Sequence, residues 1–133
     1  MKVSAAVFRG PGRPLAIESF ESPRAFRDGE ALVEVECCTL CGSDLHSIRG
    51  DRGVELPVIL GHEIVGRLCQ IGGELSDIAG RPLSVGDRVS WSISTSCGHC
   101  FYCGEGLPQK CENGFKYGHS ALAGEHPLSG GLA

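Results

Sequence analysis

The sequence predicts a single, mainly β domain made of short strands, many turns and only short helices. Its 133 residues are enough to bury a hydrophobic core of their own. Twenty glycines and seven prolines interrupt the chain often, and aromatic residues account for only 6% of it. The apolar residues recur in short alternating runs, which is the pattern of half-buried strands.

Two short strands are expected at the start of the chain. They cover Lys2–Phe8 and Leu15–Phe20, with a turn-rich segment at residues 9–14 between them. Such a pair is typical of the opening of a barrel or a sandwich. A longer alternating run begins after Gly29 and continues to Cys38. Its period of two places Cys37 on the same face as the valines, so we expect Cys37 to face the core and Cys38 to face away from it.

The middle of the chain combines one short helix with two further strands. Residues 42–49 form the predicted helix, with Ser43 as its N-cap and Gly50 as the residue that ends it. A glycine and a proline in residues 75–85 interrupt any helical period, which predicts an irregular loop. Strands are predicted on either side of this loop, over residues 63–71 and 87–93.

The pattern changes in a lobe that contains four cysteines. Few apolar residues occur between Ser94 and Cys111, so packing alone cannot order this segment. The cysteines follow the spacing C-x2-C-x2-C-x7-C, which turns four sulfurs onto one tetrahedral zinc ion, with no position left for a substrate. An iron-sulfur cluster would accept the same ligands, and disulfides are the other alternative. The predicted structural zinc ligands are Cys97, Cys100, Cys103 and Cys111, and His99 is taken as a solvated loop residue.

The expected cytoplasmic location of the protein argues against disulfides. The apolar run that follows Met1 ends at Phe8, which is too short for a signal peptide, and no stretch of the sequence is long enough to span a bilayer. We therefore expect a cytoplasmic protein whose eight cysteines are reduced. The net charge is −4 and the basic residues are scattered, so a small molecule is a more natural partner than nucleic acid or a membrane.

A second group of possible metal ligands is spread along the chain. Cys41 follows the long alternating strand, and His62 and Glu63 stand just before the next one. Three protein ligands leave a fourth zinc position open, which is what a catalytic zinc needs. On the residues alone, the His-Glu pair also fits a turn or a surface ion pair.

The order of four motifs resembles that of the zinc-dependent medium-chain alcohol dehydrogenase/reductase family. The motifs are Cys-Gly-Ser-Asp-Leu-His at 41–46, Gly-His-Glu-x-x-Gly at 61–66, Gly-Asp-Arg-Val at 86–89 and the four-cysteine lobe. They cover most of the chain, which therefore resembles the N-terminal catalytic domain of this family. The resemblance implies a GroES-like, partly open β-barrel over residues 1–133, with short helices and a structural-zinc lobe at residues 94–112.

The resemblance also implies roles for single residues. Cys41 and His62 match catalytic-zinc ligands, and Glu63 matches the neighbouring glutamate, which is a ligand in some states of the family. The carboxylate of Asp44 matches the group that orients the zinc-binding histidine. The proton relay would use two residues of the predicted helix: the hydroxyl of Ser43 takes the substrate proton and His46 passes it toward solvent. Zinc would act as a Lewis acid during hydride transfer between an alcohol and a nicotinamide cofactor.

Two departures from the family pattern matter. The family takes its remaining catalytic ligand from a segment after the lobe, and no residue between Tyr117 and Ala133 matches it; His119, Glu125 and His126 are available but do not fit the motif. The G-x-G-x-x-G signature is also missing, so we expect the Rossmann cofactor domain to lie beyond this chain, which would be an inactive fragment by itself. The full-length protein is then expected to bind two zinc ions per chain and NAD or NADP, and to form a homodimer or homotetramer. Residues 107–111 and 115–119 further resemble dehydrogenases predicted to act in phosphonate metabolism.

Two rival interpretations remain open at this point. A zinc-binding interaction module would explain the lobe but not Cys41, His62 and Glu63. A thiol-redox protein would use Cys38 and Cys41 as a C-x-x-C pair, although the βαβ unit that normally carries such a pair is not visible in the sequence.

Overall fold

The computed structural model describes residues 1–119 and 128–133 and contains two three-stranded antiparallel sheets. The first sheet has the order β2-β1-β4, with β1 at Lys2–Phe8, β2 at Ala16–Glu21 and β4 at Val58–Ile59. The second has the order β3-β5-β6, with β3 at Ala31–Thr39, β5 at Glu63–Ile71 and β6 at Arg88–Ser90.

The hydrophobic core lies where β1 meets β4 and the last described residues. Val7, Phe8 and Ile59 are almost fully buried there. Leu132 packs against this core, and its backbone bonds both Ala6 and Leu60, at 2.8 and 3.1 Å. The segment at residues 128–133 therefore closes one side of the first sheet.

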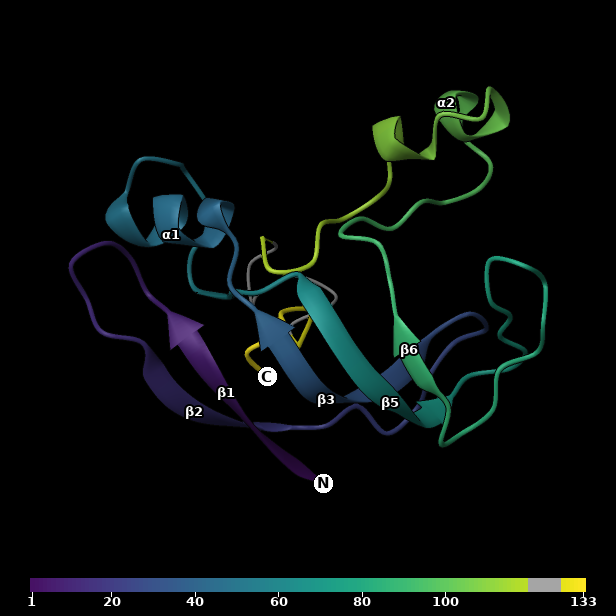
Figure 1. The fold of residues 1–133 in the computed structure, drawn as a ribbon, viewed down its shortest axis with the longest axis horizontal. Coiled ribbons are helices and arrows are strands. Elements are labelled where there is room, and N and C mark those ends of the chain that lie inside the picture. The colour runs from purple at the N-terminus through teal and green to yellow at the C-terminus, as the bar shows by residue number, and fades with distance from the viewer. Residues whose placement is uncertain (120–127) are drawn as a thin grey trace.

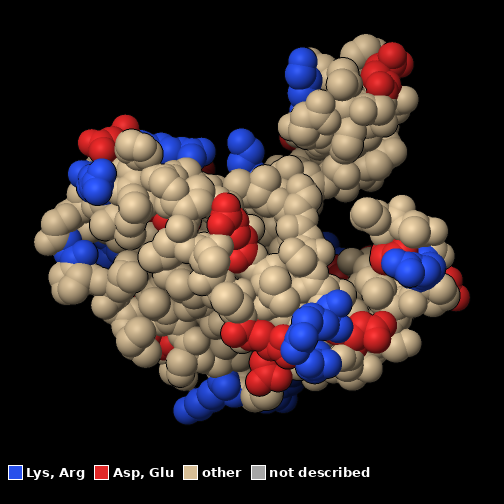
Figure 2. Space-filling model, in the orientation of Figure 1, with Lys and Arg blue, Asp and Glu red and all other residues tan. Residues whose placement is uncertain are grey.

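The two sheets do not close into a complete barrel. An open groove of about 1030 Å³ lies between them, lined by residues such as Val33, Leu68, Trp91 and Leu128. The predicted mainly β, partly open barrel is therefore confirmed. Figure 1 shows α1 and the cysteine lobe at the same end of the sheets, and Figure 2 shows the lobe as a protrusion that a hollow separates from the body of the domain.

Among the described residues, three short helices lie outside the sheets. Helix α1 spans Gly42–Arg49, α2 spans Phe101–Gly104 and the 3-10 helix η1 spans Pro108–Lys110. Helix α1 has the predicted bounds and ends at Gly50, whose φ of 88° is left-handed and suits glycine. None of the helices in the described part of the chain has the length and apolar character needed to cross a membrane.

Each predicted strand is present in the structure, but some strands begin or end at other residues than predicted. Strand β5 has the predicted bounds, whereas β2 is shifted by one residue from the expected Leu15–Phe20. Strand β6 stops at Ser90 instead of residue 93, because the chain turns toward the lobe there. The two-residue β4 was not predicted.

The predicted orientation of Cys37 is wrong because β3 contains a bulge. Val35 pairs with Gly66 and Cys37 pairs with Val65, so Glu36 is an extra residue that inverts the alternation after it. Cys37 is consequently exposed and Cys38 is half-buried. The carboxylate of Glu36 accepts hydrogen bonds from the Nε atoms of Arg67 and Arg88, at 3.1 and 2.7 Å.

Candidate metal centres

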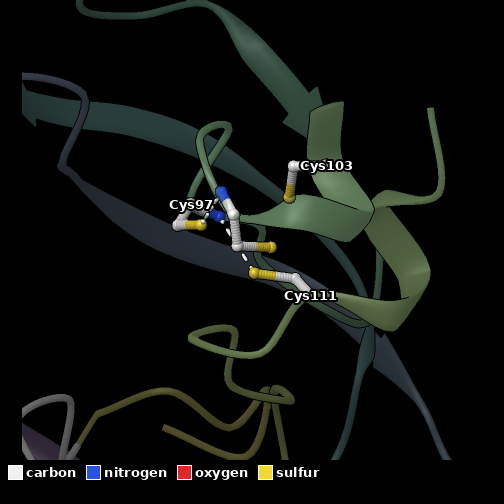
Figure 3. Close-up of side chains that lie close together, drawn as sticks. Cys97, Cys103 and Cys111 are labelled. Carbon is white, nitrogen blue, oxygen red and sulfur yellow. Dashed lines mark hydrogen bonds between the residues drawn. The ribbon is translucent and has the colours of Figure 1, made fainter. Parts of the chain in front are cut away.

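The four cysteines of the lobe come together as the sequence spacing predicts. Cys97 and Cys100 lie on a turn, Cys103 lies on α2 and Cys111 follows η1. All four sulfurs lie within 4.8 Å of one another, and Figure 3 shows those of the labelled cysteines turned toward a common centre. Sulfurs bound to one tetrahedral zinc at about 2.3 Å would be about 3.8 Å apart, so this group fits zinc.

Backbone N–H groups point at the sulfurs of the lobe. Cys97 N–H donates to the Cys111 sulfur at 3.2 Å, and Cys100 N–H donates to the Cys97 sulfur at 3.3 Å. Hydrogen bonds, the largest from the His99 backbone, lower the pKa of Cys97 to about 5. Desolvation, and then hydrogen bonds with the other three cysteines, raise the pKa of Cys103 to about 11. A bound cation would stabilise all four thiolates together.

The second candidate centre lies where β3 ends and β5 begins. Thr39 pairs with Glu63 across these strands, so Cys41, two residues later, lies beside His62. The ligand atoms of Cys41, His62 and Glu63 lie within 4.8 Å of one another. The Cys41 sulfur is 3.3 Å from Nε2 of His62, close to the separation of about 3.6 Å expected for a sulfur and a nitrogen on one tetrahedral zinc. The donor set and its spacing therefore fit zinc.

The start of α1 differs from the prediction in a way that affects this centre. The N-cap is Cys41, not Ser43, and the Cys41 sulfur accepts a hydrogen bond from the Ser43 N–H at 3.3 Å. The Ser43 hydroxyl is consequently not used as a cap. Its oxygen lies 3.0 Å from the Cys41 sulfur and 3.5 Å from Nε2 of His62, so it faces the candidate centre.

Asp44 connects the two segments that carry the candidate ligands. Its side chain is fully buried, and its Oδ2 accepts a hydrogen bond from Cys41 N–H at 3.0 Å while its Oδ1 accepts one from Gly61 N–H at 3.3 Å. Nδ1 of His62 lies 3.5 Å from Oδ1 of Asp44 but makes no hydrogen bond with any described residue. The carboxylate thus fixes the backbone on both sides of the centre, and it lies beside Nδ1 of the His62 ring.

The other predicted site residues, His46 and Glu63, are exposed. Nδ1 of His46 is 3.3 Å from Oδ2 of Asp51, and both side chains are more than half exposed. Glu63 is also exposed, and its Oε2 accepts a hydrogen bond from the Thr39 hydroxyl at 2.5 Å. An open pocket of about 580 Å³ begins at His62 and Glu63, with Trp91 and Ile93 on its wall.

His119 is a neighbour of the centre that the motif comparison leaves out. Its ring stacks on the His62 ring, with the centroids 5.2 Å apart and the planes at 30°. Desolvation lowers the pKa of His119, and its buried Nε2 makes no hydrogen bond with the residues that the structure describes. Spacing within the sequence gives no signal for this contact, since the residues are far apart in the chain. Glu125 and His126, also set aside in the sequence, lie outside the described residues.

The redox interpretation of Cys38 gains no support from its surroundings. Its thiol donates to the Thr39 carbonyl at 3.6 Å, and desolvation raises its pKa. A redox-active cysteine normally has a lowered pKa and access to solvent. The pair at positions 38 and 41 is therefore better described as a half-buried thiol beside a candidate metal ligand.

Comparison with known proteins identifies similar sequences and structures. Residues 27–133 match the alcohol dehydrogenase GroES-like domain. The chain is 35% identical over 92% of its length to zinc-type alcohol dehydrogenase B of Aspergillus flavus, and it covers 27% of that protein. It is 38% identical over 92% of its length to an alcohol dehydrogenase of Geobacillus stearothermophilus, of which it covers 35%.

Solved structures agree with these sequence matches. An alcohol dehydrogenase from Thermotoga maritima superposes with a TM-score of 0.85 at 36% identity, over 98% of this chain and 36% of that one. A zinc-binding dehydrogenase from Sinorhizobium meliloti, bound to NADP, gives a TM-score of 0.69 at 29% identity, over 89% of this chain and 32% of that one. The chain thus spans about a third of the length of these relatives.

Proposed function

Because this chain belongs to the alcohol dehydrogenase GroES-like domain family, we propose that residues 1–133 are the catalytic domain of a zinc-dependent, NAD- or NADP-dependent alcohol dehydrogenase. The observation that carries the proposal is the group formed by Cys41, His62 and Glu63, which lies beside an open pocket. Three protein donors and an adjacent pocket are what a catalytic zinc requires.

The two metal centres are assigned different roles. The catalytic centre would be held by Cys41, His62 and Glu63, and a zinc ion bound there supplies Lewis-acid chemistry to an alcohol or carbonyl oxygen. The lobe would hold a structural zinc, because its donors leave no position for a substrate. Its ligands would be Cys97, Cys100, Cys103 and Cys111.

The residues of α1 would move the substrate proton. The Ser43 hydroxyl faces the centre, so it can accept a proton from an alcohol held there as it gives up its own proton. His46 lies three residues further on and therefore on the same side of the helix, and its exposed ring can pass the proton to water. The buried carboxylate of Asp44 keeps the start of α1 and the His62 segment in place during this transfer.

In this proposal, the cofactor and the assembly would belong to a longer protein that contains this domain. Hydride transfer would use a nicotinamide cofactor, in line with the NADP bound to the Sinorhizobium relative. A separate Rossmann domain would hold this cofactor, so the 133 residues alone would be inactive. We also propose a cytoplasmic homodimer or homotetramer. A link to phosphonate metabolism is the finer form of the proposal, and it rests on the sequence resemblance of residues 107–111 and 115–119.

Metal analysis and kinetics of the full-length protein test the proposal. We expect two zinc ions per chain and turnover of an alcohol with NAD or NADP. Changing Cys41 to Ser or His62 to Ala should remove one zinc and nearly all turnover. Changing Cys97 to Ser should remove the other zinc and lower the melting temperature. A single zinc per chain without cofactor-dependent turnover would support the zinc-binding interaction module instead.

A further inference from the structure

The His62 ring stacks on the His119 ring, and this contact limits the rotation of the His62 ring. Its Nε2 faces the Cys41 sulfur, whereas its Nδ1 lacks a hydrogen bond to the described residues. Rotation about the last side-chain bond of histidine is weakly restricted by the bond itself. The His119 ring, whose centroid lies 5.2 Å away in a stacked geometry, therefore restricts the orientation of His62.

The backbone brings His119 to this position through a short stem at the base of the lobe. Thr95 N–H donates to the Phe115 carbonyl at 3.0 Å, and Tyr117 N–H donates to the Ile93 carbonyl at 2.8 Å. These bonds join the chain entering the lobe to the chain leaving it. The stem ends beside the catalytic centre, so the lobe and that centre are connected by this short segment.

The last contact of the stem depends on a glycine. The φ of Gly118 is 71°, and a Cβ atom at this position would lie 2.6 Å from the Gly61 carbonyl oxygen. Only glycine tolerates both the left-handed conformation and this close approach. Gly118 thereby lets the two backbones approach at Gly61. As a result, His119, which follows Gly118, lies against His62, which follows Gly61.

We propose that His119 is a positioning residue of the catalytic metal centre: its ring holds the His62 ring in the orientation in which Nε2 binds the metal. The inference rests on the proposed function, since it takes His62 as a zinc ligand. The positioning role is assigned to the aromatic ring of His119, because the ring makes the contact with His62, whereas its Nε2 has no hydrogen-bond partner among the described residues.

The test compares variants of His119 in the full-length protein loaded with Co²⁺. Changing His119 to Ala removes the ring, whereas changing it to Phe keeps a planar ring and removes the nitrogens. His99 to Phe is the matched control, because that histidine is exposed and bonds within the lobe, to the Cys97 carbonyl. The readouts are the affinity of the centre for Co²⁺ and the part of the Co²⁺ absorption spectrum that is lost when His62 is changed to Ala.

We expect the alanine variant to bind Co²⁺ about tenfold more weakly at this centre and to show a shifted spectrum, as residues that orient a metal ligand typically do. The phenylalanine variant and the His99 control should bind Co²⁺ at this centre with an affinity within about twofold of that of the unsubstituted protein. If the alanine variant fails to fold, His119 to Leu takes its place, because leucine fills the space without a planar ring. We expect the leucine variant to show the same weaker Co²⁺ binding and shifted spectrum.

Two results would overturn the inference alone: an alanine variant with unchanged affinity and spectrum, or a phenylalanine variant as weak as alanine. If His62 to Ala changes neither the metal content nor the spectrum, His62 is not a ligand. The inference and the proposed catalytic centre then fail together.

Discussion

Replacing Asp44 with Asn probes the centre with the smallest change of shape. The carboxylate accepts hydrogen bonds from the N–H groups of Cys41 and Gly61, one at each oxygen. An amide keeps the volume of the side chain but turns one acceptor into a donor. One of the two buried N–H groups therefore faces another N–H group and loses its partner.

The expected cost follows from the burial of Asp44, whose side chain is fully buried. A buried donor left without a partner costs about 1–3 kcal/mol, and weakening the remaining charged bond adds about 1 kcal/mol. The amide avoids the desolvation of a charge, which offsets part of this loss. We expect a net destabilisation of about 1–3 kcal/mol. Metal affinity at the Cys41 and His62 centre should fall about 10- to 100-fold, because the two ligand segments are no longer held together.

Urea unfolding and Co²⁺ titration of the full-length protein measure these two effects. Asp51 to Asn is the matched control, since that carboxylate is exposed and, among the described residues, lies against the exposed His46 ring. The control should change the free energy of unfolding by less than about 1 kcal/mol. An Asp44 variant as stable as the original protein, with metal affinity within about twofold, would refute the role given to this carboxylate.

Three further changes test the fold and the lobe. Cys103 to Ser should remove one zinc per chain in metal analysis and lower the melting temperature by several degrees, at about 2–4 °C for each kcal/mol lost; unchanged metal content would contradict the structural site. The pKa of Glu36 is lowered, chiefly by its hydrogen bond to Arg88, so its contribution to stability is present above the unfolded-state pKa and is lost as the pH falls through the lower folded-state pKa. Glu36 to Gln should therefore lower the melting temperature at pH 7, with a difference that disappears in acid; an equal loss at both pH values would count against the ion pairs. A Cβ on Gly66 would overlap Val33 and the Glu34 carbonyl, so Gly66 to Ala should cost about 1–3 kcal/mol of unfolding free energy in a denaturant titration. Gly53 to Ala is the control, because no atom lies within 4 Å of a Cβ there, and it should cost less than the Gly66 change.

The sequence predicts best those features that local pattern determines. The end of α1 follows from Gly50 and the bounds of β5 follow from the glycines that flank it, and both agree with the structure. The cysteine spacing of the lobe likewise fixes which sulfurs can meet, because x2 spacings place successive sulfurs on one side of a turn.

Features that depend on contacts between distant segments were missed or mistaken. The bulge at Glu36 is set by pairing with β5, so strand alternation alone puts Cys37 on the wrong face. The N-cap is a separate case: cysteine is not among the residues that usually cap helices, so residue preference favours Ser43, whereas the structure uses Cys41. The contact of His119 with His62 arises only when the stem folds back, and no local pattern contains it.

Zinc content measured on the full-length protein and on its Cys41 to Ser variant tests the central claim most directly. The account predicts two zinc ions per chain in the original protein and one in the variant, with the lobe still occupied and the alcohol-dependent reduction of NAD or NADP lost. Equal zinc content in the two proteins, or turnover that survives the substitution, would contradict a catalytic metal centre at Cys41, His62 and Glu63.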